Sequence, residues 1–209
     1  MRGNYAAKSM KLVFASNNKH KLEEVRQILP TNVEVISLRE IGFMQDINET
    51  GVTLEENSAL KAQEVWNWMN EKALLDSFDG VFADDTGLEI RVLKGAPGVY
   101  TARWAGDEAC DVKNRKKALY ELRGKEDRAA RFRTVVSLII KGEMLQVEGI
   151  VNGQIATEEE GNGGFGYDPV FIPAGYNKTF ASLSSNEKNA ISHRGRALEA
   201  LRKLIDNVY

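Results

Sequence analysis

Two long, mostly apolar strand patterns stand next to each other in the middle of this chain of 209 residues. They span Ala129–Ile140 and Met144–Ile155, and only Lys141, Gly142 and Glu143 separate them. Such a short connection suits antiparallel strands, because a parallel pair needs a crossover of roughly a dozen or more residues. Strands and helices mix over the rest of the chain, which predicts an α/β protein with a mixed sheet and disfavours a purely parallel, doubly wound fold.

Hydrophobic spacing predicts the other strands and the helices. Thr53 and Glu56 have the spacing of a capping box, which marks the start of a long helix. Strands are expected at residues 11–16, 33–37, 80–83 and 88–93, with a Gly/Pro loop at 95–98. Helices are expected at residues 19–29, from Thr53 to about Leu75, from about Asp107 to Leu122, and from about Asn186 towards the C-terminal end.

Composition and charge limit the partners of the chain. The formal net charge is −2, which gives no indication of a protein that binds nucleic acid or an anionic membrane. No segment reaches the roughly 18 apolar residues of a membrane span, and the first residues lack the apolar core of a signal peptide. Cys110 is the only cysteine, so an intramolecular disulfide and a cysteine-rich zinc site are excluded. These features predict a cytoplasmic protein.

A single domain is expected over residues 10–209. The chain is 43% hydrophobic and 28% charged, the balance of a globular protein that can bury a substantial core. Residues 1–9 are mostly polar or small, and Met10 stands directly before the first strand pattern. This opening segment is interpreted as an N-terminal extension, either an added remnant or an upstream start, and is left out of the fold.

An acidic turn is expected where Asp84 and Asp85 are followed by Thr86 and Gly87, between two predicted strands. Carboxylates are ligands of hard divalent cations that also bind substrate phosphates, which makes Mg²⁺ the expected metal and Mn²⁺ its alternative. Neighbours on a strand point to opposite faces, so we expect one carboxylate to face a cleft and the other to brace the loop or bind water near the metal. A plain surface turn is the alternative interpretation.

A second metal ligand is expected in or just after the loop that precedes this turn. Glu49 is the preferred candidate, and most of the other acidic residues there are expected to be solvated. The candidates are Asp46, Glu49, Glu55 and Glu56.

The first strand ends in a polar segment, residues 16–21, where the first helix begins. Backbone amides at a helix N-terminus attract phosphate. A helix cap with solvated lysines is the simpler interpretation, and the segment matches neither the GxxxxGK[ST] phosphate loop nor the GxGxxG dinucleotide motif. The candidate phosphate-binding residues are Ser16, Asn17, Asn18, Lys19, His20 and Lys21.

A glycine-rich loop between residues 161 and 169 can bring its backbone close to a flat ligand, with Gly166 at its centre. Phe165 or Tyr167 can stack on a base, and Asp168 can accept a hydrogen bond from a ring N–H. The alternative is a tight loop whose aromatic side chains only cover the core.

Near the start of the last predicted helix, Lys188 and Arg194 place two cations close to His193, the second of only two histidines. On their own, these residues predict no more than a charged helix face.

Four separated segments resemble one family, the inosine triphosphate pyrophosphatases, also called the Ham1-like pyrophosphatases of non-standard purine nucleotides. The segments follow the family's order and approximate spacing, and the match spans nearly the whole chain. Residues 49–57 and 95–103 are also similar. The four segments are Ser16-Asn-Asn-Lys-His-Lys21, Ala83-Asp-Asp-Thr-Gly87, Gly163-Gly-Phe-Gly-Tyr-Asp-Pro169 and Glu187-Lys-Asn-Ala-Ile-Ser-His-Arg194.

The resemblance implies an elongated, curved mixed sheet with flanking helices, in two lobes around a nucleotide cleft, and a homodimer. It implies magnesium-dependent hydrolysis of ITP, dITP, XTP and dXTP to the monophosphate and pyrophosphate, which cleanses the nucleotide pool of deaminated purines. Two alternatives stay open. The chain could be a Maf-like pyrophosphatase for modified pyrimidine nucleotides, whose fold is similar, or a nucleotide-binding sensor without catalysis.

The same resemblance implies that Asp85 is the catalytic carboxylate and a metal ligand. The family often has a carboxylate one position before Glu49, where this chain has Asn48, so Glu49 is expected to take over as the second metal ligand. Asn17 stands where the family commonly has glycine, and this difference is expected to alter the turn that follows the first strand. The substrate contacts implied are Ser16, Asn18 and Lys21 with the triphosphate, Thr86 with the substrate, Phe165, Tyr167 and Asp168 with sugar and base, Lys188 with phosphate, and His193 with Arg194 at the purine edge.

Overall fold

One mixed sheet of seven strands runs through the protein, whose computed structural model describes residues 9–208. The predicted N-terminal extension, residues 1–9, lies outside the described residues except for Ser9. The strands are β1 Met10–Phe14, β2 Val33–Ser37, β3 Gly80–Ile90, β4 Pro97–Gly98, β5 Ala129–Ile140, β6 Glu143–Ile155 and β7 Phe171–Pro173. The α-helices are α1 Lys19–Ile28, α2 Leu54–Glu71, α3 Asp111–Glu121, α4 Ser185–Ile191 and α5 His193–Val208, and short 3₁₀ helices are η1 Leu75–Ser77, η2 Arg91–Leu93, η3 Thr101–Arg103, η4 Asp168–Val170 and η5 Phe180–Ser182.

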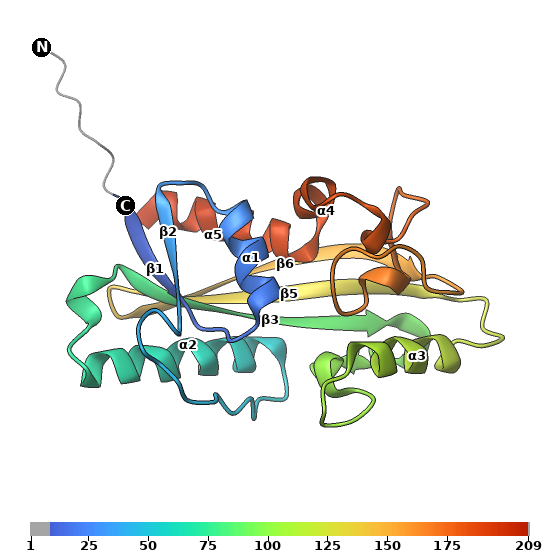
Figure 1. Ribbon diagram of the computed structural model, residues 1–209, viewed down its shortest axis with the longest axis horizontal. Coiled ribbons are helices and arrows are strands. Elements are labelled where there is room, and N and C mark those ends of the chain that lie inside the picture. Colours follow the sequence, from blue (N-terminus) through green and yellow to red (C-terminus); the bar gives the residue numbers. More distant parts are fainter. Residues whose placement is uncertain (1–8, 209) are drawn as a thin grey trace, which may run out of the picture.

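The strand order is β2–β1–β3–β5–β6–β7, with the short β4 paired to β3. The pairs β1–β2 and β1–β3 are parallel, and the pairs from β3 to β7 are antiparallel. The predicted hairpin of two long strands is confirmed, and Lys141 and Gly142 at its tip have the positive φ angles, 52° and 80°, that tight hairpin turns require. The mixed α/β fold is therefore confirmed, with β3, β5 and β6 running along the length of an elongated molecule (Figure 1).

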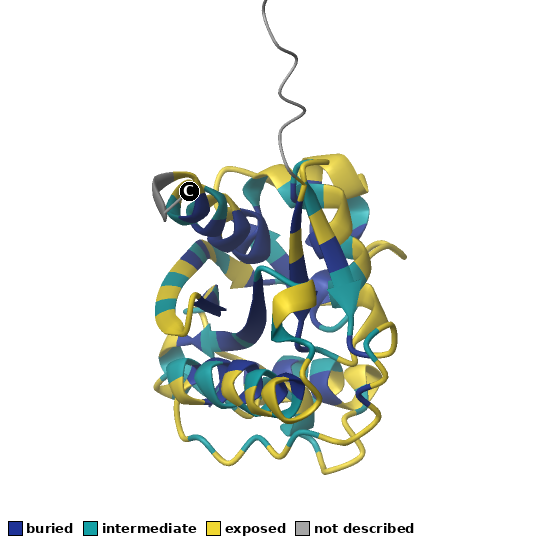
Figure 2. Cartoon of the chain, turned by 90° about the vertical axis from the view of Figure 1, so that its left-hand side faces the viewer, coloured by how far each residue is buried: buried dark blue, intermediate teal, exposed yellow. Residues whose placement is uncertain are grey.

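Helices cover both faces of the sheet (Figure 1). Side chains of β1 alternate between the two faces, so that Leu12 and Phe14 pack in the cluster that includes α5, and Val13 packs in the cluster that includes α2. At the other end of the sheet, α3 covers a third cluster built around Phe132. The helix faces turned to the sheet are buried and the outer faces exposed, as Figure 2 shows. None of the described helices has the length and apolar character that crossing a membrane requires.

The predicted acidic turn between two strands is wrong. Residues 80–90 form a single strand, and Asp84 and Asp85 pair with Val136 and Val135 of β5 in its middle. A buried strand can carry two adjacent carboxylates when each of them has a charged partner, because pairing offsets the cost of removing a charge from water. Of the predicted strand at residues 88–93, only residues 88–90 are extended, as the end of β3, and η2 follows.

The last helix was predicted as one continuous element, and this prediction is wrong in one respect. The helix is broken at Ser192 into α4 and α5. Ser192 has extended backbone angles, φ −66° and ψ 159°, and its Oγ accepts from the N–H of Gly195 at 3.0 Å. Ser192 therefore acts as the N-terminal cap of α5. The apolar spacing is similar in α4 and α5, so hydrophobic periodicity alone does not reveal the break.

Two other helix boundaries differ from the prediction. The predicted capping box at Thr53 and Glu56 is confirmed, but α2 ends at Glu71 rather than near Leu75. The third helix begins at Asp111 rather than near residue 107, since Ala109 has a positive φ of 47°, which an α-helix does not allow.

The start of α5 is pressed directly onto β6 at Gly149. A Cβ atom at this position would lie 2.1 Å from the His193 carbonyl oxygen and 2.3 Å from the Ala197 nitrogen. We predict that Gly149→Ala lowers the free energy of unfolding by about 1–3 kcal/mol, because the helix has to move away from the sheet. Urea denaturation measures the change. Asn152→Ala, at an exposed position of the same strand, is the control, and equal midpoints for the two variants would contradict the prediction.

Candidate active site

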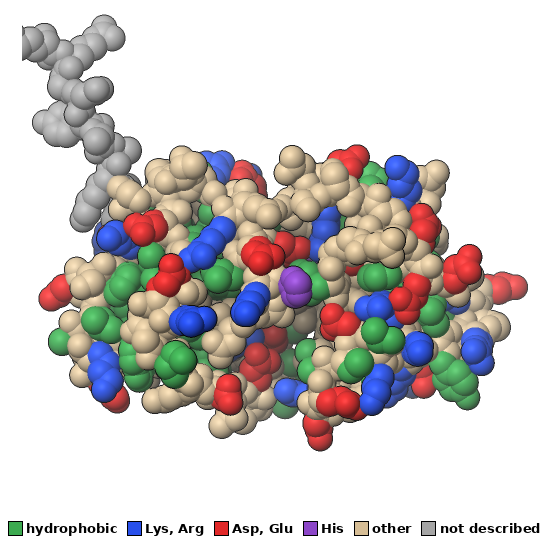
Figure 3. Space-filling view, viewed as in Figure 1, with side chains coloured by type: hydrophobic (Ala, Val, Ile, Leu, Met, Phe, Trp, Pro, Cys, Tyr) green, Lys and Arg blue, Asp and Glu red, His purple; other side chains and the backbone are tan. Residues whose placement is uncertain are grey.

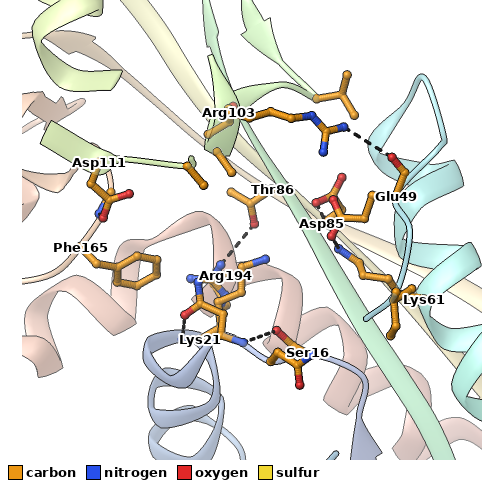
Figure 4. A pocket seen from close by; sticks show the side chains of 18 of the residues that line it. Ser16, Lys21, Glu49, Lys61, Asp85, Thr86, Arg103, Asp111, Phe165 and Arg194 are labelled. Carbon is orange, nitrogen blue, oxygen red and sulfur yellow. Dashed lines mark hydrogen bonds and ion pairs between the residues drawn. The ribbon is translucent and has the colours of Figure 1, made fainter. Parts of the chain in front are cut away.

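A cavity of about 820 Å³ is lined by residues of α1, α2, β3, α3 and the glycine-rich loop. Its volume is within the size range of small-molecule sites. Figure 3 shows the hollow from outside, and Figure 4 shows the side chains inside it. Two of the predicted site residues, Lys19 and His20, are not among the described residues that line it. The predicted residues that do line it are Ser16, Asn17, Asn18, Lys21, Glu49, Asp85, Thr86, Phe165, Gly166, Tyr167, Asp168, Lys188, His193 and Arg194.

Asp84 lies on the face of β3 that α1 and α5 cover, and both its oxygens accept from cations. Lys21 donates to Oδ1 at 3.0 Å, and Nε of Arg194 donates to Oδ2 at 3.0 Å. Arg194 also donates to Glu24 of α1 and, at 3.2 Å, to the Thr86 hydroxyl. Asp84 therefore connects the start of α1 to the start of α5.

Asp85 points to the opposite face of β3, towards α2. Lys61 of α2 donates to Oδ1 of Asp85 at 3.3 Å and to Oε1 of Glu49 at 2.8 Å (Figure 4). The second oxygen of Asp85, Oδ2, is buried and has no hydrogen-bond partner among the described residues. Lys61 thus joins the two predicted metal ligands and leaves one carboxylate oxygen free for another group.

These surroundings separate the pKa values of the two adjacent carboxyls. Burial tends to raise the pKa of Asp84, but the charges of Lys21 and Arg194 outweigh it and hold the pKa well below its usual range. Burial, helped by Glu49 and Asp84, raises the pKa of Asp85 against the opposing effect of Lys61. Asp84 is therefore a permanent anion, and Asp85 is the better proton acceptor of the two.

The predicted phosphate segment is both a helix cap and part of the cavity wall. Oδ1 of Asn18 accepts from the Lys21 N–H at 3.1 Å, and the Ser16 hydroxyl oxygen accepts from the Asn18 N–H at 3.2 Å. The N-terminus of α1 therefore opens towards the cavity beside the Lys21 ammonium group. This arrangement suits an anionic ligand.

The glycine-rich loop is tied to the cavity through Asp168. Its Oδ2 accepts from Lys188 at 2.6 Å and from the Phe165 N–H at 2.8 Å. A Cβ atom at Gly164 would lie 2.0 Å from this oxygen, and Gly164 has a φ of 68°, so no other residue fits there without distortion. Lys188 also donates to Glu24 at 2.6 Å, which links the loop to α1.

His193 and, within this loop, Tyr167 are buried side chains that line the cavity. His193 is buried, stacks on Phe132 with ring centroids 4.5 Å apart, and its Nδ1 has no hydrogen-bond partner among the described residues. Burial and the nearby charges of Arg194 and Lys188 hold the pKa of His193 well below its usual value, so the imidazole is neutral. The Tyr167 hydroxyl donates to the Thr101 carbonyl at 3.0 Å, which fixes the ring in the wall of the cavity.

Sequence reasoning missed several residues that shape the cavity. Lys61 and Glu24 stand on helices that also carry exposed charged residues, and a charged side chain on such a helix is usually solvated. A signal was present for Lys61, since it follows Asn57 by four residues on the buried face of α2. Arg103 of η3 and Asp111 of α3 also line the cavity.

A model of the Ham1 family matches residues 12–204. The chain belongs to the Ham1 family. The dITP/XTP pyrophosphatase of Christiangramia forsetii is 45% identical over 196 residues, which cover 94% of this chain and 99% of that protein. The protein of the same name from Bacillus subtilis is 48% identical over 198 residues, covering 93% and 96%. The solved structure of a HAM1 protein from Coxiella burnetii gives a TM-score of 0.83 at 37% identity, covering 95% of this chain and 99% of that one.

The resemblance found in the sequence is thereby confirmed. In this Ham1 family protein, each of the four matching segments contributes side chains to the same cavity. Segments 16–21 and 83–87 contribute polar and charged side chains, segment 163–169 contributes the aromatic rings of Phe165 and Tyr167, and segment 187–194 contributes Lys188, His193 and Arg194.

Asp84 makes the stability of this Ham1 family protein depend on pH. Its pKa is lower in the folded than in the unfolded chain, so its ionised form stabilises the fold above about pH 4, and this contribution is lost as the pH falls towards the folded-state pKa. We predict that Asp84→Asn lowers the free energy of unfolding at pH 7 by about 3–5 kcal/mol, because Lys21 and Arg194 lose their partner. The variant should also lose less stability than the wild type between about pH 5 and pH 3.

Urea denaturation at several pH values tests both parts of this prediction. Asp127→Asn is the control, because this exposed carboxylate is paired with the exposed Arg91 and surface pairs contribute little. Wild-type stability and an unchanged pH profile in Asp84→Asn would show that the network does not stabilise the fold.

Proposed function

We propose that this chain hydrolyses the triphosphates of non-standard purines, ITP, dITP, XTP and dXTP, to the nucleoside monophosphate and pyrophosphate. The observation that carries the proposal is the position of Asp85. Asp85 lines a cavity that is also lined by cations, a helix N-terminus, aromatic rings and a neutral histidine, and one of its carboxylate oxygens has no hydrogen-bond partner among the described residues. The named activity of the relatives, dITP/XTP pyrophosphatase, agrees with a ligand of this shape and charge.

Asp85 orients a water molecule and accepts a proton from it as the water oxygen attacks the α-phosphorus. The bond between the α-phosphorus and its bridging oxygen breaks, and pyrophosphate leaves with the electron pair. A bound divalent cation would lower the pKa of the water, which makes its proton easier for Asp85 to accept. Lys61 is charged, since Asp85 and Glu49 raise its pKa against the effect of burial, and it keeps Asp85 in place.

A divalent cation, Mg²⁺ or alternatively Mn²⁺, fits the residues present. No group of three or more His, Cys, Asp or Glu residues is arranged as a complete metal site within residues 9–208. Asp85, with its unpartnered Oδ2, and Glu49 offer two carboxylates, and substrate phosphates would complete the ligand set, as is usual for Mg²⁺. Such an ion supplies charge that stabilises phosphate oxygens and lowers the pKa of water.

The triphosphate is proposed to bind beside the N-terminus of α1 and the nearby lysine side chains. Ser16 and Asn18 present a hydroxyl and an amide at the N-terminus of α1, and Lys21 provides a charge there. Lys188 reaches the same space from α4. Its ion pairs with Glu24 and Asp168 hold the ammonium group in one position.

Recognition of the base depends on an oxygen at purine position 6. Inosine and xanthine carry this acceptor, whereas adenine carries an amino group, so a buried donor on His193 or Arg194 would be left unpaired by adenine. The guanidinium of Arg194 is held by Asp84 and Glu24, which fixes the direction of its remaining N–H groups. Guanine shares the oxygen, and its extra amino group has to be rejected by the loop from Phe165 to Asp168.

We predict that Asp85→Asn lowers kcat for ITP by at least about 100-fold, because the substitution removes the proton acceptor but keeps the shape. The affinity for ITP should change by no more than a few fold, since other side chains bind the nucleotide. Pyrophosphate release measures turnover, and equilibrium titration measures binding. Asp127→Asn is again the control, and undiminished turnover in Asp85→Asn would remove this residue from the mechanism.

A substrate panel tests the proposed specificity. We expect kcat/KM for ITP and XTP to exceed that for ATP and GTP by at least about 100-fold, since unpaired buried donors can give ratios up to about 10⁴–10⁵. Comparable efficiency on all four would refute the specificity. A preference for a modified pyrimidine triphosphate would favour the Maf-like alternative, and a higher melting temperature with ITP but no pyrophosphate release would favour the sensor.

A homodimer and a cytoplasmic location stay predictions of the family resemblance and of the composition. Size-exclusion chromatography with light scattering decides the first.

A further inference from the structure

His20 makes a ring contact at the rim of the cavity. It lies in the first turn of α1, is exposed, and stacks on Phe165 with ring centroids 5.3 Å apart and ring planes inclined by 16°. No hydrogen bond or ion pair of its imidazole is found within the described part of the chain. The stack therefore connects the segment proposed to bind phosphate with the loop proposed to bind the base.

Two cations also lie over the Phe165 ring. Nζ of Lys188 lies 4.9 Å from the ring centroid, and Cζ of Arg194 lies 5.7 Å from it. Both residues are buried, 5% and 2% exposed, whereas His20 is exposed. The ring of Phe165 thus contacts one exposed imidazole and two buried cations.

His20 and the donors proposed to read the base differ in burial. His193 and Arg194 are 5% and 2% exposed, whereas His20 is exposed. His20 contacts Phe165 and does not itself line the cavity. An effect of His20 on the purine therefore has to pass through the Phe165 ring.

We infer that His20 is a positioning residue that holds the Phe165 ring in the orientation in which it receives the purine. The inference rests on the proposed function. His20 holds the ring of Phe165 in place before the base arrives, so less conformational freedom is lost when the nucleotide binds. It touches neither the reacting phosphate nor the purine, and its effect passes through Phe165.

Comparing His20→Ala with His20→Phe tests this inference, because phenylalanine keeps the aromatic layer and alanine removes it. In His20→Ala we expect KM for ITP to rise about two- to tenfold, the range of a single aromatic pair, with kcat within twofold of the wild type. His20→Phe should restore the wild-type KM. Inhibition by inorganic tripolyphosphate, which has no base, should be the same in all three proteins. Glu23→Ala, at an exposed position of the same helix, is the control for effects on α1.

Three results would overturn the inference. An unchanged KM in His20→Ala would show that the stack does not matter, and a lower KM would show that His20 competes with the base. Equal weakening of ITP and tripolyphosphate binding would place His20 at the phosphate end. Failure of the wild-type protein to release pyrophosphate from any purine triphosphate is a different result, which would refute the proposed function and the inference with it.

Discussion

The pairing of Asp84 with two cations is the interaction on which the rest of the site depends. A carboxylate in the centre of a buried strand is costly unless both its oxygens are paired, and here Lys21 and Arg194 supply the partners from two different helices. Glu24 extends the network by binding Arg194 and Lys188 together. The strand, the first helix and the last two helices are thereby held in one arrangement around the cavity.

Such a network is a weak source of stability, because removing several charges from water costs nearly as much as their attraction returns. What the network does is fix the orientation of the side chains that it joins. Each of its cations also lines the cavity, so side chains that a ligand would meet are already oriented before it binds. Pre-oriented charges do not have to reorganise during the reaction, which is how an active site stabilises developing charge more effectively than water does.

Much of the fold could be predicted from the sequence, and the failures have a common cause. The hairpin of β5 and β6 and the cap at Thr53 depend on local spacing, and local spacing predicted them. The continuity of β3 and the buried position of Lys61 depend on partners far away in the chain. Asp84 and Asp85 look like a turn as long as the cations that neutralise them are not known to lie beside them.

The candidate site, too, depends on contacts between residues that are far apart in the chain. Family motifs led to half of the residues that line the cavity, but motifs do not show which side chains are bound to one another. The link between Glu49 and Asp85 through Lys61, and the contact of His20 with Phe165, became visible only when the segments were brought together in space.

Because adjacent residues of a strand face opposite sides of its sheet, Asp84 and Asp85 belong to two separate environments although one peptide bond joins them. A slip of β3 by a single residue against β1 and β5 would turn Asp84 to the face of Lys61 and Asp85 to the face of Lys21 and Arg194, and would shift both carboxylates along the strand from their present partners. The hydrogen-bond register of the central strand is therefore itself a determinant of the chemistry, and a substitution that disturbs the ladder can abolish activity while every side chain of the site is intact.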